Sequence, residues 1–270
     1  MEASPESDRR FRLTLQYDGH AFRGWQVQPG ERTVQQVVEA ALGRLMDRET
    51  TVVAAGRTDR GVHATGQVVS TLASSRWTAQ ALERALNAVL PDDVRVAAAD
   101  EVPLDFHARY DALARGYEYR VGTEPAAWSP FIRRWCWPLA AALAPDALTA
   151  AARRFSGTHS FRAFAKAGQP ERGEHCTVVR AEWREWHGRG HVFHVVANRF
   201  LHHMVRYMVG TMVDVARGRR PLDDVAALLA GSGGLETSPP APPEGLFLTR
   251  VYYTHNEWEA EERIDEVLPG

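Results

Sequence analysis

The sequence predicts an α+β fold built from two ferredoxin-like halves, each a mainly antiparallel sheet flanked by helices. Residues 11–104 show the order strand, helix, strand, strand, helix, strand, which is the split βαβ arrangement. Residues 105–254 repeat this theme loosely, without an obvious internal sequence repeat. The chain has 270 residues, of which 44% are hydrophobic and 24% charged, a composition typical of a globular protein with one large or two modest domains. We therefore expect a domain boundary near residue 104, a disordered N-terminus at 1–10 and an acidic tail at 255–270.

The first half is predicted from local patterns. Apolar residues alternate with polar ones from Phe11 to Tyr17, which indicates a half-buried strand ending at the turn that follows. Thr33 and Gln36 have the spacing of a capping box, and apolar residues behind them keep helical spacing. The expected elements are strands at 11–17, 52–55, 67–70 and 94–96, and helices at 34–46 and 78–90.

The second half shows the same two periodicities. An unbroken i, i+3, i+4 stripe runs from Leu201 to Val213 and holds three of the five Met residues; we interpret it as core. A Pro-rich run at 237–243 predicts a loop. The expected elements are strands at 117–121 and 246–253, helices at 147–155, 201–213 and 222–230, and a hairpin of 177–186 with 191–197.

The loop at 56–63 is the first candidate for chemistry. It places Arg57, Thr58 and Asp59 between Gly56 and Gly61, and glycines allow a tight loop that presents its side chains outward. Taken alone, the pattern is equally consistent with a plain turn in which the Asp is a hydrogen-bond acceptor.

Seven motifs, in order and at compatible spacing from about residue 11 to 253, extend this observation. Together they resemble the tRNA pseudouridine synthase A family, whose catalytic signature is similar to the loop at 56–64. The motifs are Tyr17-Asp18-Gly19-x-x-Phe22-x-Gly24-Trp25-Gln26-x-Gln28, Thr33-Val34-Gln35, Gly56-Arg57-Thr58-Asp59-x-Gly61-Val62-His63-Ala64, Phe106-His107-Ala108-Arg109, Tyr117-x-Tyr119, Phe200-x-His202-His203-Met204-Val205-Arg206 and Glu244-Gly245-Leu246.

The resemblance implies an isomerase that converts uridine to pseudouridine at positions 38, 39 and 40 of the tRNA anticodon stem-loop. It also implies a homodimer, a central RNA-binding cleft and no cofactor. The reaction breaks an N-glycosidic bond and remakes it to C5 of the same base, so it needs a carboxylate but neither a redox group nor a donor. By resemblance, Asp59 is that carboxylate and is assigned as the nucleophile. The sequence leaves open whether it attacks the base, attacks the sugar or abstracts a sugar proton.

The resemblance also assigns substrate-binding residues. A stacked uridine must be flipped out of the stem, and the family pattern gives Arg57 a role in flipping or in filling the vacated place. Tyr117 matches a tyrosine whose ring can stack on the base, and Tyr119 shares its side of a regular strand. Arg206 matches a basic residue that can keep the catalytic carboxylate ionised. Leu246 matches the last motif.

The charge distribution qualifies the net charge of −2, which by itself does not favour a nucleic-acid binder. Residues 255–270 hold six acidic residues and one Arg, a balance of −5, so the other 254 residues carry +3. Apart from Lys166, the basic side chains are all Arg, whose guanidinium suits phosphate contacts. The segment 229–236 has no basic residue where the family often has some, which puts a phosphate contact there in doubt.

Other features of the sequence indicate the cellular location and whether the protein binds a metal. The polar start lacks a secretory h-region, no apolar run approaches the roughly 18 residues of a membrane helix, and the chain has two cysteines, so we expect a cytoplasmic protein. His175-Cys176 and His191-x-x-His194 lack the spacing of a closed zinc site, and we expect no metal.

Two other functions fit parts of the pattern. A non-catalytic RNA-binding protein could share the scaffold, although the set Asp59, Tyr117 and Arg206 argues against lost activity. A nucleosidase that cleaves without rejoining would also place an Asp beside an oxocarbenium-like centre. The three functions differ in their product: none, free uracil or pseudouridine.

Overall fold

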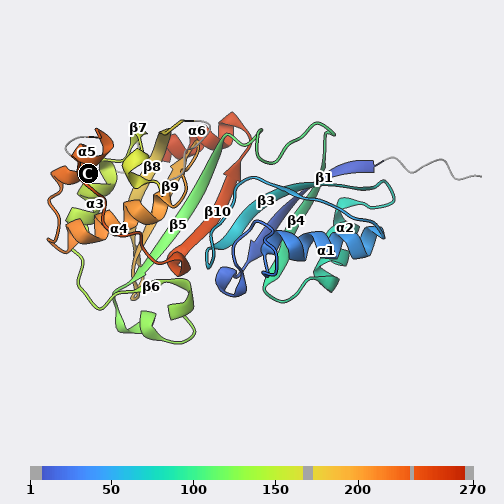
Figure 1. Cartoon of the computed structure of the whole chain (residues 1–270), viewed down its shortest axis with the longest axis horizontal. Helices are drawn as coiled ribbons and strands as arrows, with labels where there is room; N and C mark the ends of the chain where they lie inside the picture. The colour runs from blue at the N-terminus through green and yellow to red at the C-terminus, as the bar shows by residue number, and fades with distance from the viewer. Residues whose placement is uncertain (1–7, 167–172, 232–233, 265–270) are drawn as a thin grey trace, which may run out of the picture. The chain divides into compact units, whose positions relative to one another are not determined.

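The computed structural model describes residues 8–166, 173–231 and 234–264. In these ranges the protein is a mixed α+β structure with mostly antiparallel strands and six α-helices, which confirms the predicted α+β class (Figure 1). No helix of the described part is long and apolar enough to cross a membrane.

The chain divides into two compact units. The first holds Met1–Leu113 together with Leu248–Val251, and the second holds Ala114–Phe247 and Tyr252–Gly270. Strand β10 (Leu246–Tyr252) therefore supplies residues to both units.

The first unit has a sheet in the order β4-β1-β3, with the short β2 paired to β3 and β10 following β3. Strand β1 pairs antiparallel with β3 and β4, and β2 pairs antiparallel with β3. Leu13 of β1 lies opposite both Val69 and Ala99. Figure 1 shows α1 and α2 side by side over this sheet. The elements are β1 (Asp8–Tyr17), the 3-10 turn η1 (Gly19–Ala21), α1 (Val34–Met46), β2 (Val53–Ala54), β3 (His63–Ser74), α2 (Ala79–Val89) and β4 (Val94–Val102).

Local capping explains where the two helices begin. The Thr33 side chain accepts a hydrogen bond from the Gln36 N–H, and the Thr78 side chain accepts one from the Ala81 N–H. The predicted helix at 34–46 is confirmed at both ends. The alternating residues of β1 are fully or nearly buried, as the sequence pattern predicts: Phe11, Leu13, Leu15 and Tyr17.

Strand β3 is longer than predicted. It begins at His63, inside the expected loop, because Ala64 still pairs with Tyr17 of β1 across an irregularity in the register. Conversely, β2 is reduced to two residues, Val53 and Ala54.

The second unit has strands in the order β5-β9-β8-β7, antiparallel throughout, with β6 parallel to β5. The predicted hairpin is confirmed: Trp186 of β8 lies opposite Gly190 of β9. The elements are β5 (Ala114–Gly122), η2 (Pro125–Trp128), η3 (Arg133–Trp135), β6 (Trp137–Pro138), α3 (Pro145–Arg153), β7 (Gly157–Ser160), η4 (Arg162–Phe164), β8 (His175–Trp186), β9 (Gly190–Ala197), α4 (Met204–Ala216), α5 (Asp223–Leu229), η5 (Pro243–Gly245), β10 and α6 (His255–Ile264).

The two ends of the chain are described in part. Strand β1 begins at Asp8, within the N-terminal segment 1–10, whose residues 1–7 lie outside the described residues. Helix α6 begins the acidic tail, and Trp258 packs against a small buried cluster that contains Tyr252. Residues 265–270 of that tail, and 232–233 of the segment without basic residues, also lie outside the described part.

Candidate active site

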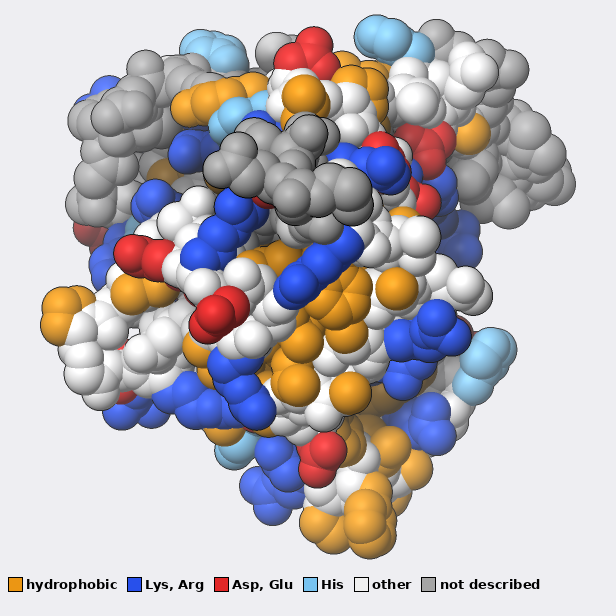
Figure 2. Space-filling view, turned by 90° about the vertical axis from the view of Figure 1, so that its right-hand side faces the viewer, with side chains coloured by type: hydrophobic (Ala, Val, Ile, Leu, Met, Phe, Trp, Pro, Cys, Tyr) orange, Lys and Arg blue, Asp and Glu red, His pale blue; other side chains and the backbone are white. Residues whose placement is uncertain are grey.

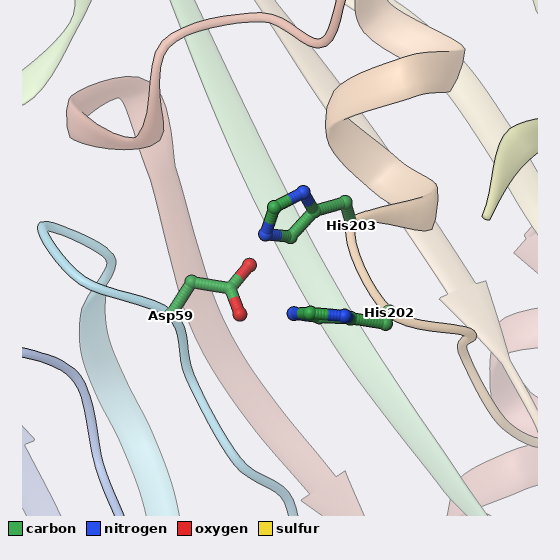
Figure 3. A group of neighbouring side chains, drawn as sticks. All are labelled: Asp59, His202 and His203. Atoms are coloured by element: carbon green, nitrogen blue, oxygen red, sulfur yellow. The ribbon is translucent and has the colours of Figure 1, made fainter. Parts of the chain in front are cut away.

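Asp59 lies on the loop between β2 and β3, in the first unit. The Val62 N–H donates to the Asp59 carbonyl over 3.1 Å, closing a turn in which Gly61 has φ +79°. A positive φ at the third position is the requirement of a type II turn, which confirms the conformational role expected of this glycine. The Asp59 side chain is half-buried, and Figure 3 shows its carboxylate projecting from the loop.

Thr58, directly before Asp59, is held by its backbone and by its side chain. Its carbonyl accepts the Trp25 N–H over 2.9 Å, and its Oγ1 is 2.8 Å from the hydroxyl oxygen of Tyr17. Thr58 and Tyr17 are both buried. The position of Asp59 is therefore set by contacts with residues more than 30 positions away in sequence.

A second buried polar side chain extends this network. Gln67 Nε2 donates to the Gly56 carbonyl over 2.8 Å and lies 3.5 Å from the Tyr17 hydroxyl. Burial raises the pKa of Tyr17 to about 12, so its hydroxyl keeps its proton over the range in which enzymes ordinarily work. We call Tyr17, Thr58 and Gln67 the loop-anchoring network.

Close backbone approach fixes the far side of the loop. A Cβ on Gly19 would overlap the carbonyl oxygen of Val62, and a Cβ on Gly24, whose φ is +97°, would lie 2.9 Å from the Thr58 carbonyl oxygen. The Gly19 N–H also donates to Nδ1 of the buried His63 over 3.0 Å. The two glycines of the first motif thus let the segment 17–25 pack directly on the catalytic signature.

Removing a hydrogen bond from the loop-anchoring network should affect the catalytic rate more than it affects substrate binding. We expect Tyr17→Phe, which leaves the buried Thr58 Oγ1 without this partner, to cost about 1–3 kcal/mol of stability and to lower kcat more than it changes the Kd for RNA. Thermal unfolding, equilibrium binding and single-turnover rates measure the three quantities.

The double variant Tyr17→Phe/Thr58→Val is the matched control, since it removes both partners of the hydrogen bond together. It should recover part of the lost stability. A double variant that loses the sum of the two single effects would show that the hydrogen bond does not anchor the loop.

Tyr117 and Tyr119 lie on β5 of the second unit, and the structure distinguishes them. Tyr119 is fully buried, and its hydroxyl donates to the Pro242 carbonyl over 2.6 Å. Burial raises the pKa of Tyr119 well above its usual value. Tyr117 is half-buried, with its ring 4.9 Å from the Phe200 ring in an edge-to-face arrangement. The Tyr119 hydroxyl is thus used inside the unit, whereas part of Tyr117 reaches the surface.

Arg206 lies on α4, and its Nε donates to the Ala241 carbonyl over 2.7 Å. The Ala241 N–H in turn donates to the Arg206 carbonyl, so the segment before η5 runs along the helix. A Cβ on Gly210 would overlap the Pro239 carbonyl oxygen, which confirms that this glycine allows close approach of another element.

The predicted helix at 201–213 is wrong at its first residues. Helix α4 begins only at Met204, so His202 and His203 precede it and do not lie on its face. His203 has φ +65°, a left-handed conformation that interrupts the helical run. Figure 3 shows the two imidazoles, whose ring centroids are 4.2 Å apart.

The two remaining predicted residues differ in exposure. Arg57 is exposed on the loop, two residues before Asp59. Leu246, the first residue of β10, is buried and closes η5, where its N–H donates to the Pro243 carbonyl. Sequence reasoning missed the roles of Tyr17 and Gln67; the only signal was the presence of Tyr17 in a motif whose purpose the pattern does not reveal.

Comparisons with known proteins identify the family of the chain. A family model described as tRNA pseudouridine synthase matches residues 14–111 and 151–254. The tRNA pseudouridine synthase A of Moorella thermoacetica is 43% identical over 244 residues, which cover 90% of this chain and 98% of that one. The chain belongs to the tRNA pseudouridine synthase A family.

Further members give the same picture. The protein of the same name from Chlorobium limicola is 42% identical over 91% of this chain and all of its own length, and the one from a Geobacter species is 39% identical over 91% and 99%. The family assignment makes the chain an isomerase that converts uridine to pseudouridine in tRNA.

Proposed function

We propose that this enzyme isomerises uridines 38, 39 and 40 in the tRNA anticodon stem-loop, with Asp59 as the nucleophile. The observation that carries the proposal is the fixed position of Asp59: it is a half-buried carboxylate whose neighbours Thr58 and Val62 are held by buried hydrogen bonds and backbone packing. A pre-positioned reacting group lowers the entropic part of the barrier.

The chemistry balances without a cofactor. The bond from C1′ to N1 of the uracil breaks and a bond from C1′ to C5 forms. The proton on C5 leaves to water, and N1 gains a proton. Asp59 supplies the anionic nucleophile for this exchange, and the bond that it forms to the substrate breaks again before product release, so the carboxylate is regenerated. No electron acceptor or donor group enters.

The target nucleotide must leave the stem, and four side chains are proposed to hold it. The partly accessible ring of Tyr117 offers a stacking face, and the exposed Arg57 fills the vacated place. Arg206, oriented by its bond to the Ala241 carbonyl, and Leu246 complete the substrate-binding set.

The proposal extends to assembly. We infer that the chain consists of two split βαβ halves, residues 11–104 and 105–254. We also infer that two copies of the chain associate as a homodimer in the cytoplasm, where tRNA is found. In support, the strand order β4-β1-β3 with β2 on β3 is the order of a split βαβ sheet.

Nucleoside analysis tests the function. Transfer RNA transcripts incubated with the pure protein should gain pseudouridine, and transcripts with cytidine at positions 38–40 should gain none. Pseudouridine at other positions would refute the proposed target, and release of free uracil would indicate a nucleosidase instead.

RNA binding should depend strongly on salt despite the net charge of −2. Figure 2 shows Arg and Lys side chains spread over one face, with fewer acidic ones among them. Because phosphate contacts release counterions, we expect the affinity for tRNA to fall at least about tenfold between roughly 50 and 200 mM salt. Filter binding measures it, and a constant affinity would exclude recognition led by phosphates.

Tyr117 should act through its ring. We expect Tyr117→Phe to keep tRNA binding and much of the rate, and Tyr117→Ala to weaken binding by the roughly 1–3 kcal/mol of one stacked base. In the parent protein the centroids of the Tyr117 and Phe200 rings are 4.9 Å apart. Phe200→Leu removes this ring contact but keeps Tyr117, so it is a control for the effect of lost packing. If the Phe variant is as inactive as the Ala variant, the hydroxyl takes part in the chemistry.

A further inference from the structure

The segment between β5 and β6 exposes large aromatic side chains. It forms the short turns η2 and η3, drawn in green beside β6 in Figure 1. Phe131 is 80% exposed, more than any other large hydrophobic side chain in the described part of the chain, and Trp128 is 42% exposed. Burial within the unit therefore does not account for these two side chains.

The base of the segment is well anchored. Ala127 and Cys136 are buried, and a Cβ on Gly122 would overlap the Ala127 side chain. The N–H groups of Thr123 and Glu124 both donate to the carbonyl of one residue in the β8–β9 turn, over 3.0 and 3.1 Å. The exposed rings are thus presented from a fixed platform, which lowers the ordering cost of binding through them.

Basic side chains lie directly beside the rings. Arg133 and Arg134 are exposed, and the Arg134 guanidinium lies 5.6 Å from the centre of the Trp135 ring. The segment from 123 to 138 holds a single acidic residue, Glu124. Arginines interleaved with exposed aromatic rings suit a ligand that carries both phosphates and flat bases.

The segment also adjoins the proposed substrate-binding residues of the same unit. Turn η3 packs against η5, and η5 leads directly into Leu246. An RNA strand that is bound at Leu246 can therefore extend over η3.

We propose that residues 125–135, the aromatic-arginine platform, bind tRNA outside the target nucleotide. Phe131 and Trp128 stack on unpaired bases, and Arg133 and Arg134 contact phosphates. The inference rests on the proposed tRNA substrate and adds a contact surface to it. A second copy of the chain is the less suitable partner, because a twofold contact through this platform would bring a surface with two exposed arginines against the same surface.

Two variants test the platform: Phe131→Ala and Arg133→Ala/Arg134→Ala. We expect Phe131→Ala to raise the Kd for tRNA about 5- to 150-fold, the range given by loss of one stacked base. The double Arg variant should reduce the slope of log affinity against log salt by about 1 to 2. Single-turnover rates at saturating tRNA should be unchanged in both.

Arg162→Ala is the matched control, since it removes an Arg whose side chain is 74% exposed elsewhere in the second unit. It should leave the Kd near the parent value. Circular dichroism and molar mass by light scattering are measured on every variant. A parent-like Kd in both platform variants would overturn the inference, and so would a changed molar mass with unchanged binding, which would assign the platform to contact between copies.

The test is separable from that of the proposed function. If the parent protein forms no pseudouridine at positions 38–40, the function fails whatever the platform variants do. If the parent is active and the platform variants bind like the parent, only the platform fails.

Discussion

Asp59→Asn is expected to abolish pseudouridine formation while leaving the fold and RNA binding intact. The amide keeps the size of the carboxylate but lacks the anion that we propose as the nucleophile, so the rate should fall at least about 10³-fold. Formation of the new bond at C5 expels its hydrogen, so release of tritium from [5-³H]uridine in tRNA measures the rate directly.

Asp100→Asn is the control for loss of a carboxylate in the first unit, where Asp100 forms an exposed ion pair with Arg12 at 3.0 Å. It should release tritium at the parent rate, because surface ion pairs contribute about 0–1 kcal/mol to stability. Near-normal release from Asp59→Asn would refute the assignment of the nucleophile.

Gly19→Ala is expected to lower kcat by roughly 10²-fold or more, although Gly19 carries no reactive group. The added Cβ would overlap the Val62 carbonyl oxygen, and this backbone cannot retreat without moving the turn that it shares with Asp59. A displacement of about 1 Å in a reacting group can cost about 10²-fold in rate.

Gly190→Ala separates this effect from general destabilisation. Its Cβ would lie 2.3 Å from a backbone carbonyl oxygen, that of Val121, but this contact joins β9 to β5 within the second unit, which does not contain Asp59. Both variants should lose thermal stability. At a temperature where both are folded, only Gly19→Ala should lose kcat, and equal losses in the two variants would show that the Gly19 contact does not position Asp59.

Local signals predicted the helices of the first unit well. Thr33 and Thr78 each cap a helix by bonding an N–H three residues ahead, and such contacts are present in the sequence itself. The alternation along β1 is equally local, because a strand with one buried face repeats every two residues.

Long-range contacts explain what the sequence could not predict. Strand pairing across the register irregularity at Tyr17 extends β3 into the expected loop. Tyr117 and Tyr119 have the same local pattern, and only the bond from Tyr119 to Pro242, 123 residues away, assigns Tyr119 to the interior. The motif match singled out Asp59 as the candidate nucleophile, but the residues that hold its loop lie in segments whose sequence shows no relation to it.

The division of β10 between the units affects how the protein folds while it is being synthesised. The first unit needs Leu248–Val251, which leave the ribosome only after about 140 more residues have followed Leu113. At roughly 5–20 residues per second, this delay lasts on the order of 7–30 s. During that time the nascent β3 has no β10 neighbour, and an unpaired strand edge is a site of aggregation. A ribosome stalled before residue 248 would therefore display a first unit that is one strand short, a form suited to recognition by chaperones.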